Sequence, residues 1–195
     1  MYEQHKAVGE VLRSIEYPNT EVLLDAACGG KGAQIRLYGD ELAGRNSSLA
    51  YIDAALVVNG EIKVVVEIEY STVRPLYLCG KVFATALSSY HSREKVRIPL
   101  ADEMMFVQVI QFLEEQSERQ PRKRAKRTSR LPQCVYLERE INRLLQDTRS
   151  RIRRYVFHYA SSGSFDIGGN DAQALKKEIL DFLRPSGTCP REAQS

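Results

Sequence analysis

Hydrophobic residues recur along the chain with two periods, and each period predicts its own kind of element. Apolar positions three or four residues apart predict helices at 3–16, from Pro75 to near 89–93, at 134–145 and at 172–183. Period-two alternation or a short apolar run predicts strands at 34–38, 104–112 and 154–160. We therefore expect an α/β fold, a mixed β-sheet flanked by helices, in one domain over 1–184 with a disordered tail at 185–195.

Residues 51–70 carry the clearest local signal. Two strand-like runs flank Asn59 and Gly60, a pair that tolerates positive φ at low cost, so the segment predicts a β-hairpin. Simple alternation along the second arm divides its side chains between two faces. One face holds Ile62, Val64, Val66, Ile68 and Tyr70, and the other holds Lys63, Val65, Glu67 and Glu69.

Glu67 and Glu69 are the first candidates for chemistry. Two carboxylates one residue apart on a strand point to the same side, roughly 6.5 to 7 Å apart. Among so many valines their repulsion is costly unless a cation lies between them or one carboxyl takes a proton. Mg²⁺ prefers carboxylate ligands of this kind, so the pair is a candidate metal site. The alternative to a metal site is a solvent-facing edge strand on which the charge of Lys63 offsets that of Glu67.

Asp53, on the first arm, joins these acids only in one hairpin register. With a two-residue loop, Asp53 faces Val66 and points away from Glu67 and Glu69. A three-residue loop or one β-bulge shifts the pairing by one residue and turns Asp53 to their side. A three-acid site therefore requires a bulge or a longer turn.

Asp53 followed after thirteen residues by Glu67-Ile68-Glu69, between two predicted helices, resembles the PD-(D/E)XK nuclease superfamily. The resemblance covers roughly residues 3–112, and it implies a restriction-endonuclease-like core in the order helix, strands, helix, strand. By this resemblance Asp53 and Glu67 bind Mg²⁺ beside the scissile phosphate. Glu10 of the first helix resembles the additional acid that several branches of the superfamily contribute to the metal.

Glu69 stands where the superfamily motif has lysine. A triplet reading Glu-x-Glu is similar to that of BamHI-like type II restriction endonucleases, and it implies that Glu69 orients or deprotonates the attacking water. Alternatively the lysine has moved to another element. Lys81 on the following helix is then the first candidate and Lys63 the second.

Positive charge is concentrated in one segment of the chain, and this concentration suggests a negatively charged partner. The net charge is +3, but residues 119–130 hold seven cations and no acid, which leaves a net −4 on the other 183 residues. Such a segment is typical of a polyanion-binding surface, although a solvated linker or, in a eukaryote, a nuclear localisation signal has the same composition. The candidate DNA-binding residues are Arg122, Lys123, Arg124, Lys126, Arg127, Arg151, Arg153 and Arg154.

Other features narrow the class of protein. No apolar stretch approaches the roughly 18 residues of a membrane span, and the polar amino terminus is unlike a secretory signal. The four cysteines have neither a CxxC pair nor a histidine at zinc-ligand spacing, which argues against structural zinc. We expect an intracellular, cytoplasmic protein, bacterial or archaeal, that does not bind membranes.

These features together predict a Mg²⁺-dependent endonuclease acting on double-stranded DNA, foremost a type II restriction endonuclease. Cutting both strands of a symmetric site favours a homodimer, with the helix from Cys134 or from Ala172 at its interface. Two alternatives stay open. One is a repair or junction-resolving nuclease of the same fold, and the other is a non-catalytic nucleic-acid-binding module.

Overall fold

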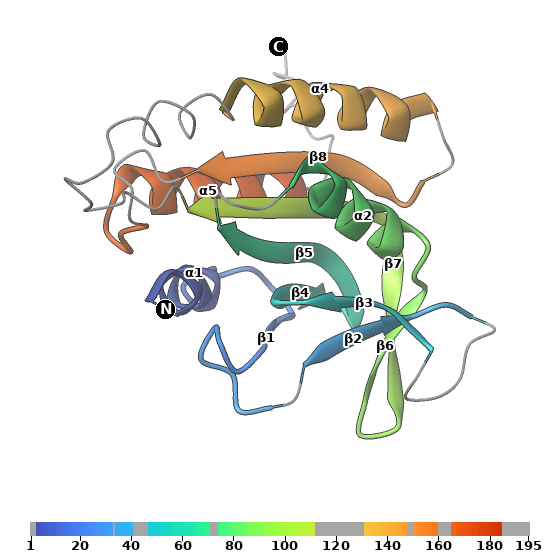
Figure 1. Ribbon diagram of the computed structural model, residues 1–195. Helices are drawn as coiled ribbons and strands as arrows, with labels where there is room; N and C mark the ends of the chain where they lie inside the picture. Colours follow the sequence, from blue (N-terminus) through green and yellow to red (C-terminus); the bar gives the residue numbers. More distant parts are fainter. Residues whose placement is uncertain are drawn as a thin grey trace, which may run out of the picture.

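The computed structural model describes residues 3–32, 34–40, 47–70, 74–111, 131–147, 150–159 and 165–184. Within these residues the fold is α/β, as expected, with an eight-stranded mixed sheet flanked by four helices (Figure 1). The helices are α1 (Glu3–Arg13), α2 (Pro75–Ala86), α4 (Leu131–Asp147) and α5 (Asn170–Leu183). The strands are β1 (Thr20–Leu24), β2 (Ile35–Tyr38), β3 (Ser48–Ile52), β4 (Ala54–Val58), β5 (Glu61–Tyr70), β6 (Tyr90–Arg93), β7 (Val96–Gln111) and β8 (Ile152–Tyr159).

The strand order is β1-β4-β5-β7-β6-β2-β3, and β8 also pairs with β7. β7 serves two parts of the sheet. Its first half pairs antiparallel with β6, and its second half lies parallel to β5 and β8. The β6–β7 hairpin therefore projects from one end of the molecule while the rest of β7 lies in the centre (Figure 1).

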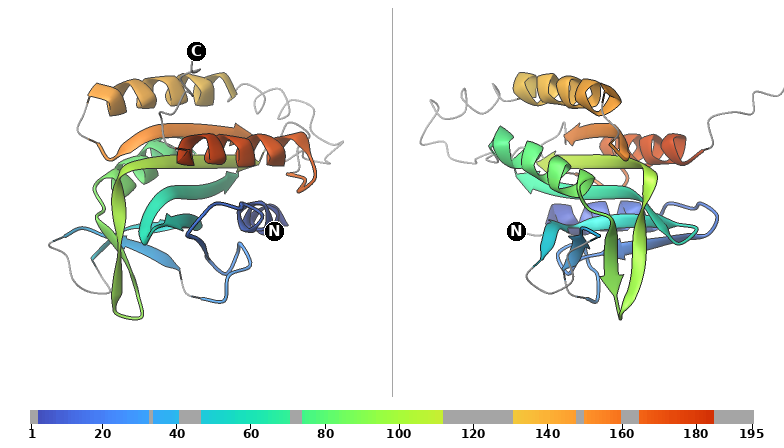
Figure 2. Two further views of the ribbon diagram at one scale, coloured as in Figure 1. Left: turned by 180° about the vertical axis from the view of Figure 1, so that it is seen from behind. Right: turned by 90° about the vertical axis from the view of Figure 1, so that its right-hand side faces the viewer.

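Two hydrophobic clusters cover the two faces of the central strands. Residues of α1 and α5 pack on one face, against Leu56, Val64 and Val66. Residues of α2 and α4 pack on the other, against Val65 and Phe106. Figure 2 shows α5 and α2 on opposite sides of β7. Burial on both faces explains why these strands read as near-continuous apolar runs.

The hairpin of β4 and β5 forms as expected, and it contains a bulge. Asn59 and Gly60 have φ of 53° and 84°, as a two-residue hairpin turn requires. Leu56 pairs with Val64 but Val57 pairs with Ile62, so Lys63 is the extra residue. Simple alternation placed Ile62 with Val64 and was wrong there, because the bulge turns Ile62 toward the α2 and α4 side.

Two other boundaries differ from the expected ones. α2 ends at Ala86, and Tyr90 begins β6, where its ring stacks on Tyr38 with centroids 5.4 Å apart. Tyr90 lies three residues after Leu87 and so mimics helical spacing. The turn between β6 and β7 has positive φ at Glu94 and Lys95, neither of which is a turn residue that sequence patterns recognise.

Four other elements begin and end within three residues of their expected bounds. They are the helices expected at 134–145 and 172–183 and the strands expected at 34–38 and 154–160. The strand expected at 104–112 is the second half of β7. The segment at 119–130 and the tail at 185–195 lie outside the described residues. In the described parts of the chain, the longest apolar helices fall short of what crossing a bilayer takes.

Candidate active site

The bulge at Lys63 brings Asp53 opposite Glu67. Ala54 pairs with Val66, and one residue further along this register Asp53 faces Glu67 across the strands. Asp53 lies in the bend between β3 and β4, and its Oδ2 accepts a hydrogen bond of 2.7 Å from the backbone N–H of Ile68. The register that a three-acid site requires is therefore the one present.

Lys81 supplies the cation between the two glutamates. It shares a face of α2 with Leu78, Val82 and Thr85, the buried positions that hold the helix against the sheet. Lys81 Nζ donates to Glu67 Oε2 at 2.5 Å and lies 2.7 Å from Glu69 Oε1. Of the two lysine candidates Lys81 reaches the acids, whereas Lys63 pairs with Glu61 at 3.7 Å beside the turn.

The burial of these charged side chains raises the pKa values of two of the carboxyl groups. The Glu67 side chain is 1% exposed, whereas those of Glu69 and Lys81 are 16% and 34% exposed. Burial first, and then the negative charge of Asp53, raises the pKa of Glu67 well above its usual value, against the lowering effect of Lys81. Burial likewise raises the pKa of Asp53, although the Ile68 N–H and Lys81 oppose this.

The donor set fits a hard divalent cation in part. One oxygen of Glu67 bonds Lys81, but Oε1 is buried without a hydrogen-bond partner, which is costly for a carboxylate. In the described residues no three side chains of His, Cys, Asp or Glu converge closely enough to hold a metal ion as they stand. Mg²⁺ commonly takes only one or two carboxylates and completes its shell with water, and Asp53 with Glu67 meets that need.

Asp25 and Cys28 also lie beside the acids, and sequence reasoning missed both. The N–H of Asp25 donates to the carbonyl of Asp53 at 2.9 Å. Burial raises the pKa of the Cys28 thiol, and the charges of Asp25, Asp53 and Glu67 raise it further, so Cys28 is an inert neutral neighbour. The sequence did carry a signal for Asp25, because this acid directly follows the strand β1 in TEVLLD, but β1 was not predicted as a strand.

α1 presents other residues to the site than the one expected. His5 is buried, and a positive charge on its ring would lower the pKa of the Asp53 carboxyl. Glu10 is exposed on the stripe of α1 that also holds Glu3, Lys6 and Arg13. Its role as a metal ligand stays a prediction without structural support.

Two of the three candidate DNA-binding arginines in the described residues make contacts within the protein. Arg154 pairs with Glu178, and Arg151 donates to the carbonyl of Leu100 at 3.1 Å. Arg153 is exposed on β8. The five candidates from Arg122 to Arg127 lie outside the described residues.

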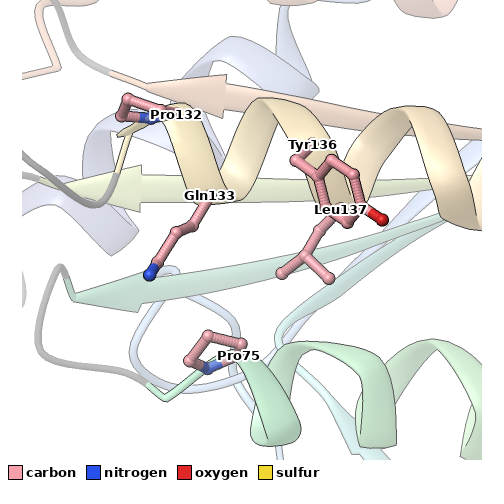
Figure 3. Close-up of a pocket in the computed structure, with 5 residues that line it drawn as sticks. All are labelled: Pro75, Pro132, Gln133, Tyr136 and Leu137. Carbon is pink, nitrogen blue, oxygen red and sulfur yellow. The ribbon is translucent and has the colours of Figure 1, made fainter.

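A separate groove opens between α2 and α4 (Figure 3). Its volume is about 380 Å³, and its lining holds no carboxylate, histidine or cysteine. Four of its five lining residues come from the first turns of α4, and Pro75 begins α2 (Figure 3). The acids of the candidate site, on β5 and in the bend before β4, are therefore not part of this groove.

Comparisons of the chain with protein families, with curated proteins and with solved structures return no match.

Proposed function

We propose that this protein is a Mg²⁺-dependent endonuclease that hydrolyses phosphodiester bonds of double-stranded DNA, foremost as a type II restriction enzyme. The proposal is supported by the order of the elements that, with β2, β3 and β6 left aside, reads α1–β1–β4–β5–α2–β7 and agrees with the resemblance to the PD-(D/E)XK nucleases. Asp53 precedes the second of these strands, and Glu67 and Glu69 lie on the third.

The observation that carries the proposal is the bulge at Lys63. One extra residue in β5 turns Asp53 to the side of Glu67, where the half-buried Asp53 carboxylate lies opposite the buried carboxylate of Glu67. A bulge costs ladder hydrogen bonds, and bulges are common beside active sites, where they re-aim a side chain. Without it, Asp53 faces Val66 and no acid pair exists.

Each residue then has a distinct role. Asp53 and Glu67 hold Mg²⁺, which when bound acidifies a coordinated water and stabilises the charge that develops on the phosphate. Glu69 is the more solvent-accessible carboxylate and takes the proton of the attacking water. Lys81, on the same side, neutralises the acids before substrate arrives and donates to a phosphate oxygen during hydrolysis.

DNA and a second copy of the chain are the proposed partners. Support for DNA comes from the cationic segment at 119–130 and from Arg153, which is exposed on β8. Phosphate contacts of this kind orient a duplex without reading its sequence. A homodimer gives each strand of a symmetric site its own pair of acids.

The test is cleavage of supercoiled plasmid and of linear duplex with Mg²⁺ or Mn²⁺ by the wild type, Asp53→Asn and Glu67→Gln. Both variants keep the shape of the side chain and remove its charge, so we expect at least a hundredfold loss of cleavage rate with the far-UV circular dichroism unchanged. Asp102→Asn is the matched control, because Asp102 is an exposed acid on β7. Discrete products indicate a restriction enzyme, and preferential cutting of branched substrates indicates a junction-resolving nuclease.

One result contradicts the proposal. If the wild type cuts no substrate with either ion but binds duplex in a salt-sensitive manner, the nucleic-acid-binding module is the correct reading. The two ion pairs that Lys81 makes with Glu67 and Glu69 then have a structural role only.

A further inference from the structure

A second surface of the molecule combines aromatic rings with arginines. β3, β2, β6 and the first half of β7 pair in that order as an antiparallel sheet, at the end of the molecule opposite α4 (Figure 1). One face of this sheet packs into the core through alternate residues of its strands, namely Ile35, Leu37, Ala50, Ile52 and Ile98. Since successive side chains of a strand point to opposite faces, the residues between these form an outer face.

The outer face holds a continuous row of flat groups. In order across the strands, its members are Tyr51, Arg36, Tyr38, Tyr90 and Arg97. The guanidinium carbon of Arg36 lies 5.4 Å from the centroid of the Tyr51 ring, and that of Arg97 lies 4.4 Å from the centroid of Tyr90. The rings of Tyr38 and Tyr90 stack with centroids 5.4 Å apart and an angle of 22° between their planes.

The row has a covered part and an open part. Tyr90 is 7% exposed, because Tyr38 and Arg97 lie against its ring, so it is the support on which these two side chains rest. Tyr51 is 46% exposed and Tyr38 is half-buried. These two rings therefore keep surface on which another flat group can stack.

The charge of this sheet favours an anionic partner. Three arginines and no aspartate or glutamate occur in its paired segments, residues 35–38, 48–52, 90–93 and 96–99. One of the three, Arg93, pairs with Glu21 of β1, whereas Arg36 and Arg97 lie over tyrosine rings of the outer face. Exposed rings beside arginines are the combination that stacks unpaired bases and holds the phosphates between them.

We infer that the outer face binds an unpaired strand of DNA, whose bases stack on Tyr51 and Tyr38 and whose phosphates contact Arg36 and Arg97. Bases within a duplex stack on one another, so an unpaired strand is the form that offers their faces to the rings. This site is separate from the acids and needs neither Mg²⁺ nor hydrolysis.

The choice of DNA over RNA alone rests on the proposed function. Tyr51 comes two residues before Asp53, a span of at most about 7 Å of extended chain. A strand bound on the outer face therefore runs close to the acids, for which DNA is the proposed substrate.

The test is fluorescence anisotropy of a labelled oligothymidylate and of a duplex of the same length, titrated with the full chain in EDTA so that metal-dependent cleavage is absent. Tyr51→Val removes the ring and keeps a residue typical of strands. We expect it to lose about tenfold in affinity for the single strand and less than twofold for the duplex. Tyr51→Phe should bind like the wild type, because stacking uses the ring and not the hydroxyl.

α4 offers a matched control. Arg139 lies over the exposed ring of Tyr136 at 5.1 Å, but this pair is on a helix and its arginine bonds Glu140. Tyr136→Leu should leave both affinities unchanged. Each phosphate contact to a single strand adds about 0.7 to the slope of log affinity against log salt, so Arg36→Gln should lower that slope by about 0.7 and Arg139→Gln should not change it.

A second measurement serves where a variant fails to fold. A strand that carries 5-iododeoxyuridine forms an adduct with a stacked tyrosine under ultraviolet light, and peptide mapping of the wild type should place this adduct on β2 or β3. Adducts confined to other parts of the chain overturn the inference.

The remaining outcomes separate this site from the proposed function. The stacking site is refuted if Tyr51→Val binds the single strand like the wild type, or loses equal affinity for single strand and duplex. Tighter binding of oligouridylate than of oligothymidylate overturns the assignment to DNA. Neither result bears on Mg²⁺-dependent cleavage of duplex, which Asp53→Asn tests, and that variant should keep its binding of the single strand in EDTA.

Discussion

Lys81 is the group whose removal tests the electrostatics of the site most directly. Lys81→Met removes the ammonium group and keeps an unbranched apolar side chain on the same face of α2. It leaves the buried Glu67 carboxyl without the ammonium group that Lys81 places 2.5 Å from its Oε2. We expect the variant to fold and to be less stable at neutral pH.

The size of the loss follows from the contacts. Two opposite charges about 4 Å apart attract by about 4 kcal/mol at an effective dielectric constant of about 20. The Lys81 side chain is 34% exposed, so solvent screens part of this attraction, and the free lysine also regains rotamer freedom. We therefore expect the free energy of unfolding to fall by about 2 kcal/mol at pH 7.5, below the roughly 3–5 kcal/mol of fully buried pairs.

The loss depends on pH in a defined direction. Without Lys81 the folded-state pKa of Glu67 rises further above its usual value, whereas in the unfolded chain it stays at about 4.5. Below that pH both states are protonated, and the variant differs little from the wild type. As the pH rises through the folded-state pKa, the unfolded chain releases its proton first, so the variant loses about 1.4 kcal/mol per additional pKa unit.

Urea unfolding followed by far-UV circular dichroism measures this effect, since the chain has no tryptophan to serve as a fluorescence probe. Wild type, Lys81→Met, Glu67→Gln and the double variant form a thermodynamic cycle. The double variant should recover most of the stability lost in Lys81→Met, because no uncompensated charge stays buried. An equal loss at pH 5 and pH 8, or a double variant no more stable than Lys81→Met, refutes the reasoning.

Three other substitutions test packing and protonation. Gly9→Ala should lower the free energy of unfolding by about 1–3 kcal/mol, because a Cβ at this position lies 2.2 Å from the carbonyl oxygen of Cys28. Gly80→Ala should raise it by about 0.5–1 kcal/mol, because Gly80 is on the exposed side of α2 and its Cβ has nothing within 4 Å. Equal effects of the two substitutions in urea unfolding contradict this expectation. Burial lowers the pKa of His158, so stability is lost as the pH falls below about 6.5, where the unfolded chain binds the proton first. His158→Gln should remove up to about 1 kcal/mol of that decline between pH 7.5 and 5.5, and parallel pH profiles for variant and wild type rule this out.

Much of the fold was predictable because its signals are local. The apolar stripe of α1, the Asn59-Gly60 turn and the helical spacing of α5 each specify one element without reference to the rest of the chain. β1 escaped detection because only Leu23 among its five residues is fully buried. The β6–β7 hairpin escaped detection because its turn residues, Glu94 and Lys95, adopt positive φ although neither is a residue type that is typical of such turns.

The candidate site was predictable only as a conditional statement. The spacing of Asp53, Glu67 and Glu69 indicates three acids, but their side depends on one bulged residue that no local pattern marks. Ile62 was assigned to the wrong face of the sheet for the same reason, because the bulge turns it to the face that holds Val65. Asp25 was invisible for a related reason: its neighbour across the sheet is 28 positions later in the chain, and only the strand pairing reveals it.

The spread of the candidate site along the chain also has a consequence for biogenesis. The acids come from the bend before β4 and from β5, whereas their counter-ion Lys81 comes from α2, so the cluster is complete only in a chain that extends through α2. During synthesis the buried Glu67 gains its neutralising partner only after Lys81 has left the ribosome and α2 has docked. A truncated product that ends at the hairpin carries the acids but lacks that partner.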